Sequence, residues 1–184
     1  MLGLGLGVNT IPNINERIIV HEADWSSDTD SYSVSPAFSS DLSIVRTASV
    51  TIDGTTYTNV LECRLVDDSA HTGEVQVQSP VMAGDDVEDN VRYYLEFDYI
   101  YPSSNDSVDR IASVNIGTAG GTKQTIDSST VTADVLHTRR VQFPDLNTIS
   151  SFLDKIFFDI PRSAGTDATN DKVYLTRVVL WRYK

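Results

Sequence analysis

The sequence predicts an all-β protein, a single sandwich or barrel of about nine or ten antiparallel strands. The first observation behind this prediction is that apolar and polar residues alternate with a period of two in many short runs. The second is that Gly, Pro, Asn and Asp separate these runs, as they do at turns between strands. The third is size, because 184 residues, 40% of them hydrophobic, can bury one core without a partner domain.

The expected strands cover most of the chain. They comprise residues 16–23, 42–52, 55–66, 74–79, 91–101, 111–117, 135–143, 155–160 and 173–183. Asp53-Gly54 separates the second strand from the third and is typical of a two-residue hairpin turn. Pro102 and Pro161 follow the fifth and eighth strands and are expected to end them, because proline has no N–H for the ladder.

Two of these strands have informative faces. On the strand at 91–101, the face expected to meet the core carries Val91, Tyr93, Leu95, Phe97 and Tyr99. The opposite, polar face carries Arg92, Tyr94, Glu96 and Asp98. The last strand is apolar on both faces, with Val173, Leu175, Val179 and Trp181 alternating with Tyr174, Val178 and Leu180. Such a strand is either central in its sheet or covered by a partner.

The net charge of the chain argues against a nucleic-acid partner, and the shortness of its apolar start argues against membrane insertion. The 26 acidic residues outnumber the 14 basic ones and give a net charge of −12, which repels phosphate backbones, so we expect no nucleic-acid partner. The apolar start MLGLGLGV is far shorter than the roughly 20 residues of a membrane span, so we expect no membrane insertion. Cys63 is the only cysteine, which allows no disulfide within the chain and favours an inert core residue.

No catalytic motif is visible in the sequence. The three histidines lack the spacing of metal ligands, and neither a nucleophile elbow nor a phosphate-binding loop occurs. Glu96 and Asp98 share one strand face, which is the arrangement closest to a carboxylate pair for glycoside cleavage. We therefore expect no enzyme, and a glycoside hydrolase or lyase using Glu96 and Asp98 remains the third hypothesis.

The segment IIVHEADWSSDTDSYSV resembles the opening of carbohydrate-binding-module-like jelly rolls, which are related to the galactose-binding-like fold. Asp24-Trp25 stands where that family has Asp-Phe, and Tyr32 takes the place of a later aromatic. YYLEFDY and KVYLTRVVLWRY are similar to its mid-chain and closing strands. The resemblance implies a jelly-roll β-sandwich over residues 15–184. Trp25 and Tyr32 themselves are either plugs that close one end of the sandwich or platforms for stacking a sugar.

The same resemblance implies a metal site. In many members of that family a structural calcium links the first loop to the last strand, and Glu22 and Asp24 are the residues here that would supply oxygen ligands. The last strand has Thr176 and Arg177 where those members often carry an aspartate. We therefore expect no cofactor, with a structural calcium at Glu22 and Asp24 as the one exception.

The N-terminal segment is expected to be a docking arm over residues 1–14. Leu2, Leu4, Leu6 and Val8 would share one face of an extended segment, and the glycines between them would let another backbone approach closely. Such a segment is ordered only when it pairs with a sheet edge. The edge belongs either to the chain's own domain or to another protein, including a second copy of the chain.

Short Leu-Gly starts resemble those of tailed-bacteriophage virion accessory proteins, which often carry a carbohydrate-binding-like jelly roll. The resemblance implies a non-enzymatic structural protein of a virion, such as a capsid, fibre or tail decoration protein anchored through its arm. Its partners would be other virion proteins and further copies of itself, and its location the virion, assembled in the host bacterial cytoplasm. The alternative is a glycan-binding module for attachment to the host surface, with Tyr94 and Trp181 as the sugar-binding residues.

Overall fold

The computed structural model describes residues 16–39, 41–66, 73–82, 91–105, 110–117, 123–126, 131–143, 155–162 and 171–184. The expected arm over residues 1–14, with Leu2, Leu4, Leu6 and Val8, lies outside these residues and stays a prediction. In the described part of the chain, the only helical element is the three-residue 3₁₀ turn η1 (Pro36–Phe38). None of the helices described is long and apolar enough to cross a membrane.

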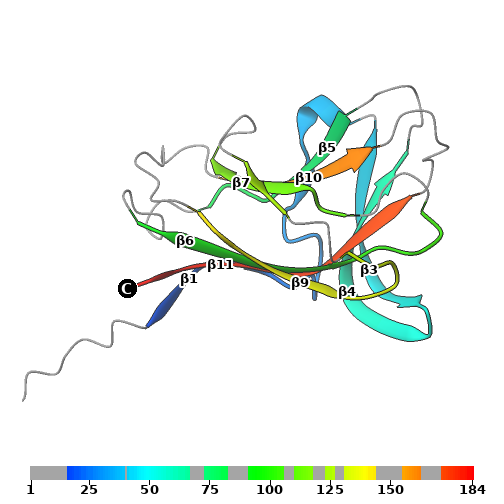
Figure 1. The fold of residues 1–184 in the computed structure, drawn as a ribbon, viewed down its shortest axis with the longest axis horizontal. Helices are drawn as coiled ribbons and strands as arrows, with labels where there is room; N and C mark the ends of the chain where they lie inside the picture. The colour runs from blue at the N-terminus through cyan, green and yellow to red at the C-terminus, as the bar shows by residue number, and fades with distance from the viewer. Residues whose placement is uncertain are drawn as a thin grey trace, which may run out of the picture.

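The described strands form two antiparallel sheets that stack as a sandwich (Figure 1). The six-stranded sheet contains β1 (Arg17–Ala23), β3 (Leu42–Ile52), β4 (Thr55–Leu65), β6 (Tyr93–Ile100), β9 (His137–Gln142) and β11 (Lys172–Tyr183). The five-stranded sheet contains β2 (Ser33–Val34), β5 (Gly73–Gln78), β7 (Ser113–Gly117), β8 (Gln124–Thr125) and β10 (Lys155–Arg162). Because the chain crosses between the sheets at most connections, each sheet is built from strands far apart in sequence. The expected all-β jelly-roll sandwich is therefore confirmed.

The described residues form eleven strands, where the sequence predicts about nine or ten. The two that the sequence pattern does not show are β2 and β8, each of two residues, which is too short for an alternating pattern. The predicted hairpin is present, since β3 and β4 pair on either side of Asp53 and Gly54. Both of these residues have positive φ values, 44° and 77°, as the expected turn requires.

One predicted strand end is wrong. Pro161 lies inside β10, which continues to Arg162. The carbonyl of Asp159 faces β7, because it accepts a bond from the amide of Ala112. Pro161 is two residues further along the strand, so its backbone groups face the same side. The pairing of β10 with β7 ends at Asp159, so the missing N–H of Pro161 breaks no ladder bond.

The core lies between the two sheets, and β6 and β10 meet there. The predicted core face of β6 is confirmed, because Tyr93, Leu95, Phe97 and Tyr99 are all at most 1% exposed. The ring of Phe97 meets that of Phe158 edge-on, with centroids 5.3 Å apart, which joins the two sheets. Cys63 is buried in the same core, as expected, and burial raises the pKa of its thiol.

The last strand, β11, is central in its sheet. Of the two explanations for its apolar faces, a central position or a covering partner, the structure supports the first. β6 pairs along one side of it, and β4 and then β1 pair along the other. The predicted faces are wrong beyond Leu175, because a register shift between Leu175 and Arg177 reverses the alternation. Val178 and Leu180 consequently join the core, and Trp181 lies on the outer face of the sheet.

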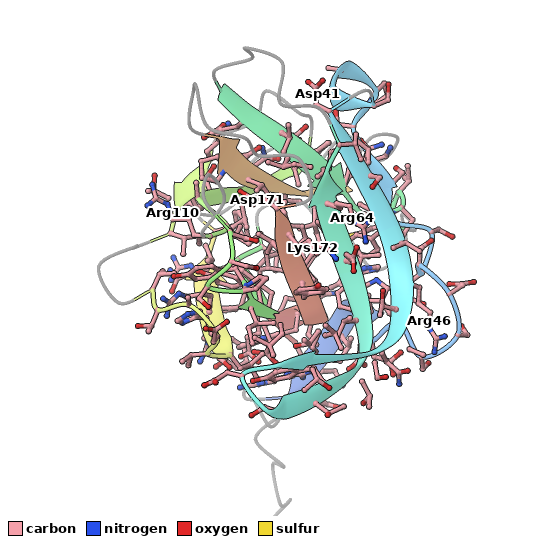
Figure 2. All side chains as sticks on the ribbon, turned by 90° about the vertical axis from the view of Figure 1, so that its right-hand side faces the viewer. Asp41, Arg46, Arg64, Arg110, Asp171 and Lys172 are labelled. Atoms are coloured by element: carbon pink, nitrogen blue, oxygen red, sulfur yellow. The ribbon has the colours of Figure 1, made fainter. Side chains whose placement is uncertain are left out.

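The loop between β1 and β2, residues 24–32, closes one end of the sandwich. Trp25 is 0% exposed, and its ring meets Tyr32 edge-on at 5.7 Å, so the plug interpretation of these two residues is confirmed. The carboxylate of Asp30 accepts bonds from the backbone amides of Asp24 and Trp25, which holds the turn. Arg46, on β3 (Figure 2), donates to the carbonyl of Trp25 at 3.1 Å and ties the loop to the sheet.

His21 makes the stability of this end depend on pH. Its Nε2 lies 3.0 Å from the hydroxyl of Tyr32, and burial lowers its pKa below 6.5, although Asp30 and Glu22 act to raise it. The unfolded chain therefore binds this proton more readily than the folded one, and stability falls as pH drops below 6.5. We expect His21→Gln to flatten the pH dependence of the melting temperature between about pH 5 and 8. An unchanged slope in the variant contradicts this assignment.

Candidate functional site

The outer face of the five-stranded sheet is polar and yet buried. β10 lies at the centre of this sheet, between β5 and β7. Its residues Ile156, Phe158 and Ile160 belong to the core between the sheets. Phe157 and Asp159 point the opposite way, because successive side chains of a strand alternate. Both are nevertheless buried, at 4% and 1% exposure, so this face is not a bare, solvated surface.

Six side chains cross this outer face in two rows. The register places Phe157 opposite Gln78 and Asn115, and it places Asp159 opposite Gln76 and Ser113. All six are less than a tenth exposed. We call this set the polar strip, and it consists of Gln76, Gln78, Ser113, Asn115, Phe157 and Asp159.

Asp159 is held in place by more bonds than any other side chain described for the polar strip. Its carboxylate accepts bonds from Gln76 Nε2 at 2.8 Å and from Ser113 Oγ at 2.6 Å. Lys123 Nζ lies 3.1 Å from the same carboxylate and also pairs with Glu74. Burial acts to lower the pKa of Lys123, but its bonds to Glu74 and Asp159 outweigh burial and raise it. The carboxylate is therefore oriented by three donors, as a preorganised acceptor needs to be.

Asn115 provides unused hydrogen-bonding capacity in the strip. It is 0% exposed, and neither its amide nitrogen nor its amide oxygen has a hydrogen-bond partner among the described residues. The side-chain oxygen of Gln76, Oε1, also has no hydrogen-bond partner among the described residues, although Nε2 of the same residue donates to Asp159. A buried polar atom without a partner costs about 1–3 kcal/mol. Groups of this kind indicate a missing partner, such as a bound water, an ion or a polar ligand.

One end of the polar strip is accessible. The side chains of Lys123 and Glu74 are 40% and 39% exposed. Thr125, at the edge strand β8, is also exposed and lies opposite Ser113. A ligand can therefore approach the strip from the β8 edge, although its centre at Phe157 and Asn115 is covered.

The residues predicted to bind a sugar lie on the other sheet and form a closed cluster. Tyr94 stacks on Trp181 with ring centroids 4.4 Å apart, and Tyr183 meets both rings edge-on. The guanidinium of Arg17 lies 4.1 Å from the centre of the Trp181 ring, and that of Arg140 lies 4.8 Å from it. Trp181 is consequently 0% exposed and Tyr94 is half-buried, so the exposed aromatic platform expected at these residues is not what the structure has.

The carboxylate pair of the enzyme hypothesis is engaged in the same cluster. Glu96 Oε1 lies 3.7 Å from both Arg17 and Arg140, which fixes and neutralises it. Asp98 lies on the same face, opposite Arg177 on β11. Both ion pairs use the same carboxylate oxygen and join Arg17 next to β11 and Arg140 on β9 to β6. The geometry therefore gives Glu96 a structural role.

Of the two residues expected to bind calcium, Glu22 lies near the end of β1 and Asp24 in the loop that follows it, and both side chains are exposed. Asp24 Oδ1 accepts the backbone amide of Ser26 at 3.0 Å, and this bond lowers the pKa of Asp24. Glu22 lies opposite Val179 in the neighbouring strand. Among the described residues, no three His, Cys, Asp or Glu side chains gather as metal ligands do. A calcium ion at Glu22 and Asp24 stays a prediction.

Sequence reasoning did not single out the polar strip. The polar positions of β5, β7 and β10 have the pattern of an ordinary solvated face, and nothing in a single strand shows that the three faces coincide. The signal that was present is chemical. Three side-chain amides, those of Gln76, Gln78 and Asn115, fall within predicted strands, and asparagine is depleted in strands.

No family model and no curated protein matches the sequence. Solved structures do share its fold. The CBM22-1 xylan-binding domain of Xyn10C from Paenibacillus barcinonensis superposes with a TM-score of 0.57 at 12% identity, over 92% of this chain and 97% of that one. The CBM1 of BiXyn10A without ligand gives 0.54 at 10% identity, over 90% and 99%. A Stig cyclase from Fischerella gives 0.50 at 12% identity, over 92% and 100%.

These similarities establish the fold. They do not establish the function, which has to be argued from the residues of the candidate site. Carbohydrate-binding modules share this jelly-roll sandwich, which confirms the predicted architectural resemblance. A cyclase shares it too, so the fold by itself does not choose between binding and catalysis. The choice depends on the chemistry of the polar strip.

Proposed function

We propose that this chain is a glycan-binding module without a catalytic role and that the polar strip is its binding surface. The observation that carries the proposal is the buried amide of Asn115, with both polar atoms unpaired among the described residues and an aromatic ring beside it. This is the alternative interpretation of the sequence, moved from Tyr94 and Trp181 to the opposite sheet. Its support from the fold is that xylan-binding and other carbohydrate-binding modules have the same architecture.

The chemistry of the polar strip suits a sugar. Sugar hydroxyls both donate and accept, and an amide side chain offers one group of each kind. Asp159 adds a charged acceptor, whose bonds to hydroxyls are stronger than those of a neutral group. Phe157 lies between Gln78 and Asn115 and supplies an apolar ring against which the carbon face of a sugar can pack.

Binding at this strip requires the face to open. All six strip residues are less than a tenth exposed, so a sugar has to displace whatever lies over Phe157 and Asn115. The exposed Lys123 and Glu74 mark the end from which it enters. We therefore expect slow association and a ligand that raises the melting temperature, because it binds the folded state alone.

Asn115→Ala separates binding from folding. Because its amide atoms have no partner among the described residues, removing them is expected to leave the unfolding free energy unchanged or slightly raised. Affinity for the recognised polysaccharide should fall about tenfold or more. The measurement is calorimetric titration of xylan, mannan, mixed-linkage glucan, galactan and bacterial cell-surface polysaccharides, with a thermal melt of each protein.

Thr58→Ala is the control, since Thr58 is exposed on β4 of the other sheet. It should bind as the unsubstituted chain does. Wild-type affinity in Asn115→Ala would remove the polar strip from the proposal, and a folded protein that binds no glycan in the panel would remove the proposal itself.

The virion interpretation remains a prediction from the N-terminal residues, which lie outside the described part of the chain. The similarity to xylan-binding modules supports glycan binding better than it supports that role. A particle-bound glycan-binding protein would satisfy both, with the jelly roll attaching to a host surface.

A further inference from the structure

Lys123 reaches across the outer face of the five-stranded sheet. The strands of this sheet follow the order β2-β5-β10-β7-β8, and Lys123 directly precedes the edge strand β8. Its ammonium group nevertheless pairs with Asp159 on the central strand β10 and with Glu74 on β5. The side chain therefore lies over the row of the polar strip that contains Asp159, at the end from which a ligand enters.

The two carboxylates around this ammonium group carry more charge than it neutralises. Asp159 is 1% exposed, and Lys123 is the only basic side chain within ion-pair distance of it among the described residues. Lys123 Nζ and Ser113 Oγ contact the same carboxylate oxygen, Oδ2. Glu74 adds a second negative charge at the same ammonium group. One cation thus serves two carboxylates, in a chain whose net charge is already −12.

Buried acceptors without a partner lie on the same face of the sheet. Gln76 Oε1 belongs to β5 and lies two residues from Glu74, on the same face of that strand. Asn115 Oδ1 lies in the neighbouring row. Neither oxygen has a hydrogen-bond partner among the described residues, and the two residues are 4% and 0% exposed. They indicate a missing donor, and this observation is independent of the two carboxylates.

A sugar that binds on the row of Asp159 has to displace Lys123. The lysine side chain is 40% exposed, so its ammonium group can turn to water at little cost. The carboxylate of Asp159 stays buried and loses its counter-ion, which is unfavourable. A neutral hydroxyl group does not restore the positive charge, whereas a protonated amine does. The three N–H groups of an amine can donate to Asp159, to Glu74 and to a buried amide oxygen.

We infer that the ligand of this module is an amino glycan, whose protonated amine replaces the ammonium group of Lys123 between Glu74 and Asp159. This inference rests on the proposed function, and it adds the chemical class of the ligand. Lys123 neutralises the buried carboxylate until the ligand arrives. It also lowers the affinity for neutral sugars, because these displace it without replacing its charge.

The test compares glycans that differ only in the group at one ring carbon. Calorimetric titrations use the hexamers of chitosan, chitin and cellulose, which carry at that carbon an amine, an acetylated amine and a hydroxyl group. The buffer is kept at a pH at which the chitosan amines are protonated. We expect the chitosan hexamer to bind about tenfold tighter than either neutral hexamer, with an affinity that falls as NaCl is raised.

Three variants locate the effect. Glu74→Gln should bind the chitosan hexamer about tenfold more weakly, since it removes one of the two charges that hold the amine. Glu16→Gln is the matched control, because Glu16 is exposed, also pairs with a lysine, Lys184, and precedes β1 of the other sheet. It changes the net charge by the same amount and should leave this affinity unchanged. Lys123→Met removes the competing ammonium group and should bind the chitosan hexamer about tenfold tighter.

Each other outcome counts against the inference. A chitosan hexamer that binds no tighter than the neutral hexamers overturns it and leaves the proposed function standing, provided that a neutral glycan binds. A chitosan affinity that Glu74→Gln lowers no more than Glu16→Gln does reflects only the charge of the whole chain and overturns it too. Lys123→Met that binds the chitosan hexamer no tighter than the unsubstituted chain contradicts the replacement of Lys123. A folded protein that binds neither these hexamers nor the polysaccharides above overturns inference and function together.

Discussion

Trp181→Ala is expected to lower the free energy of unfolding by about 3–5 kcal/mol. The ring is 0% exposed, it stacks on Tyr94, and the guanidinium groups of Arg17 and Arg140 pack against it. Its loss leaves a cavity on the outer face of β11 and removes the cation–π contacts that hold β1 and β9 to it. Urea denaturation at neutral pH measures the effect.

The matched variant is Trp181→Phe. It keeps an aromatic ring for Tyr94 and the two arginines and should lose no more than about half as much stability. The sequence alone predicts something different, namely a variant that folds normally and loses sugar binding. That outcome, an alanine variant with the wild-type denaturation midpoint and no glycan affinity, contradicts a structural role for Trp181.

Asp159→Ala is the second substitution with a large expected effect. It removes the acceptor of Gln76 Nε2 and Ser113 Oγ, both of which are buried, and each buried donor left without a partner costs about 1–3 kcal/mol. We therefore expect a loss of about 2–5 kcal/mol. Lys123 adds little to this figure, because its exposed ammonium group can turn to water. The same variant should bind no glycan.

Asp159→Asn separates the carboxylate's shape from its charge. The amide oxygen still accepts one of the two buried donors, so the variant should be more stable than Asp159→Ala by about 1–2 kcal/mol. Its amide nitrogen cannot accept from Lys123, so glycan affinity should stay low. Equal stability of the alanine variant and the unsubstituted chain would show that Asp159 does not organise the strip.

The architecture could be predicted because most strands are long enough to show alternation. β6 is the clearest case, where the apolar set from Tyr93 to Tyr99 is the set that meets the core. For Trp25 the sequence leaves a plug and a sugar-stacking platform as alternatives, and its 0% exposure in the structure decides for the plug. Alternation carries no information about β2 and β8, because two residues do not define a period.

The candidate site could not be predicted for two physical reasons. A register shift of one residue between Leu175 and Arg177 reverses every side chain that follows, so Trp181 could not be assigned to a face from the strand pattern. The polar strip depends on pairing, since Gln76, Asn115 and Asp159 come from strands that are distant in sequence and adjacent only in the sheet. No local pattern reports which strands pair.

The central claim, that a glycan binds on the five-stranded sheet, is tested most directly by mapping the binding surface with nuclear magnetic resonance. Amide nitrogen–proton spectra are recorded with and without the polysaccharide that calorimetry identifies. We predict shifts in the side-chain amide signals of Asn115, Gln76 and Gln78, together with the backbone signals of β7 and β10. Shifts confined to the cluster of Tyr94, Trp181 and Tyr183 on the six-stranded sheet would contradict the account and restore the site that the sequence alone predicts.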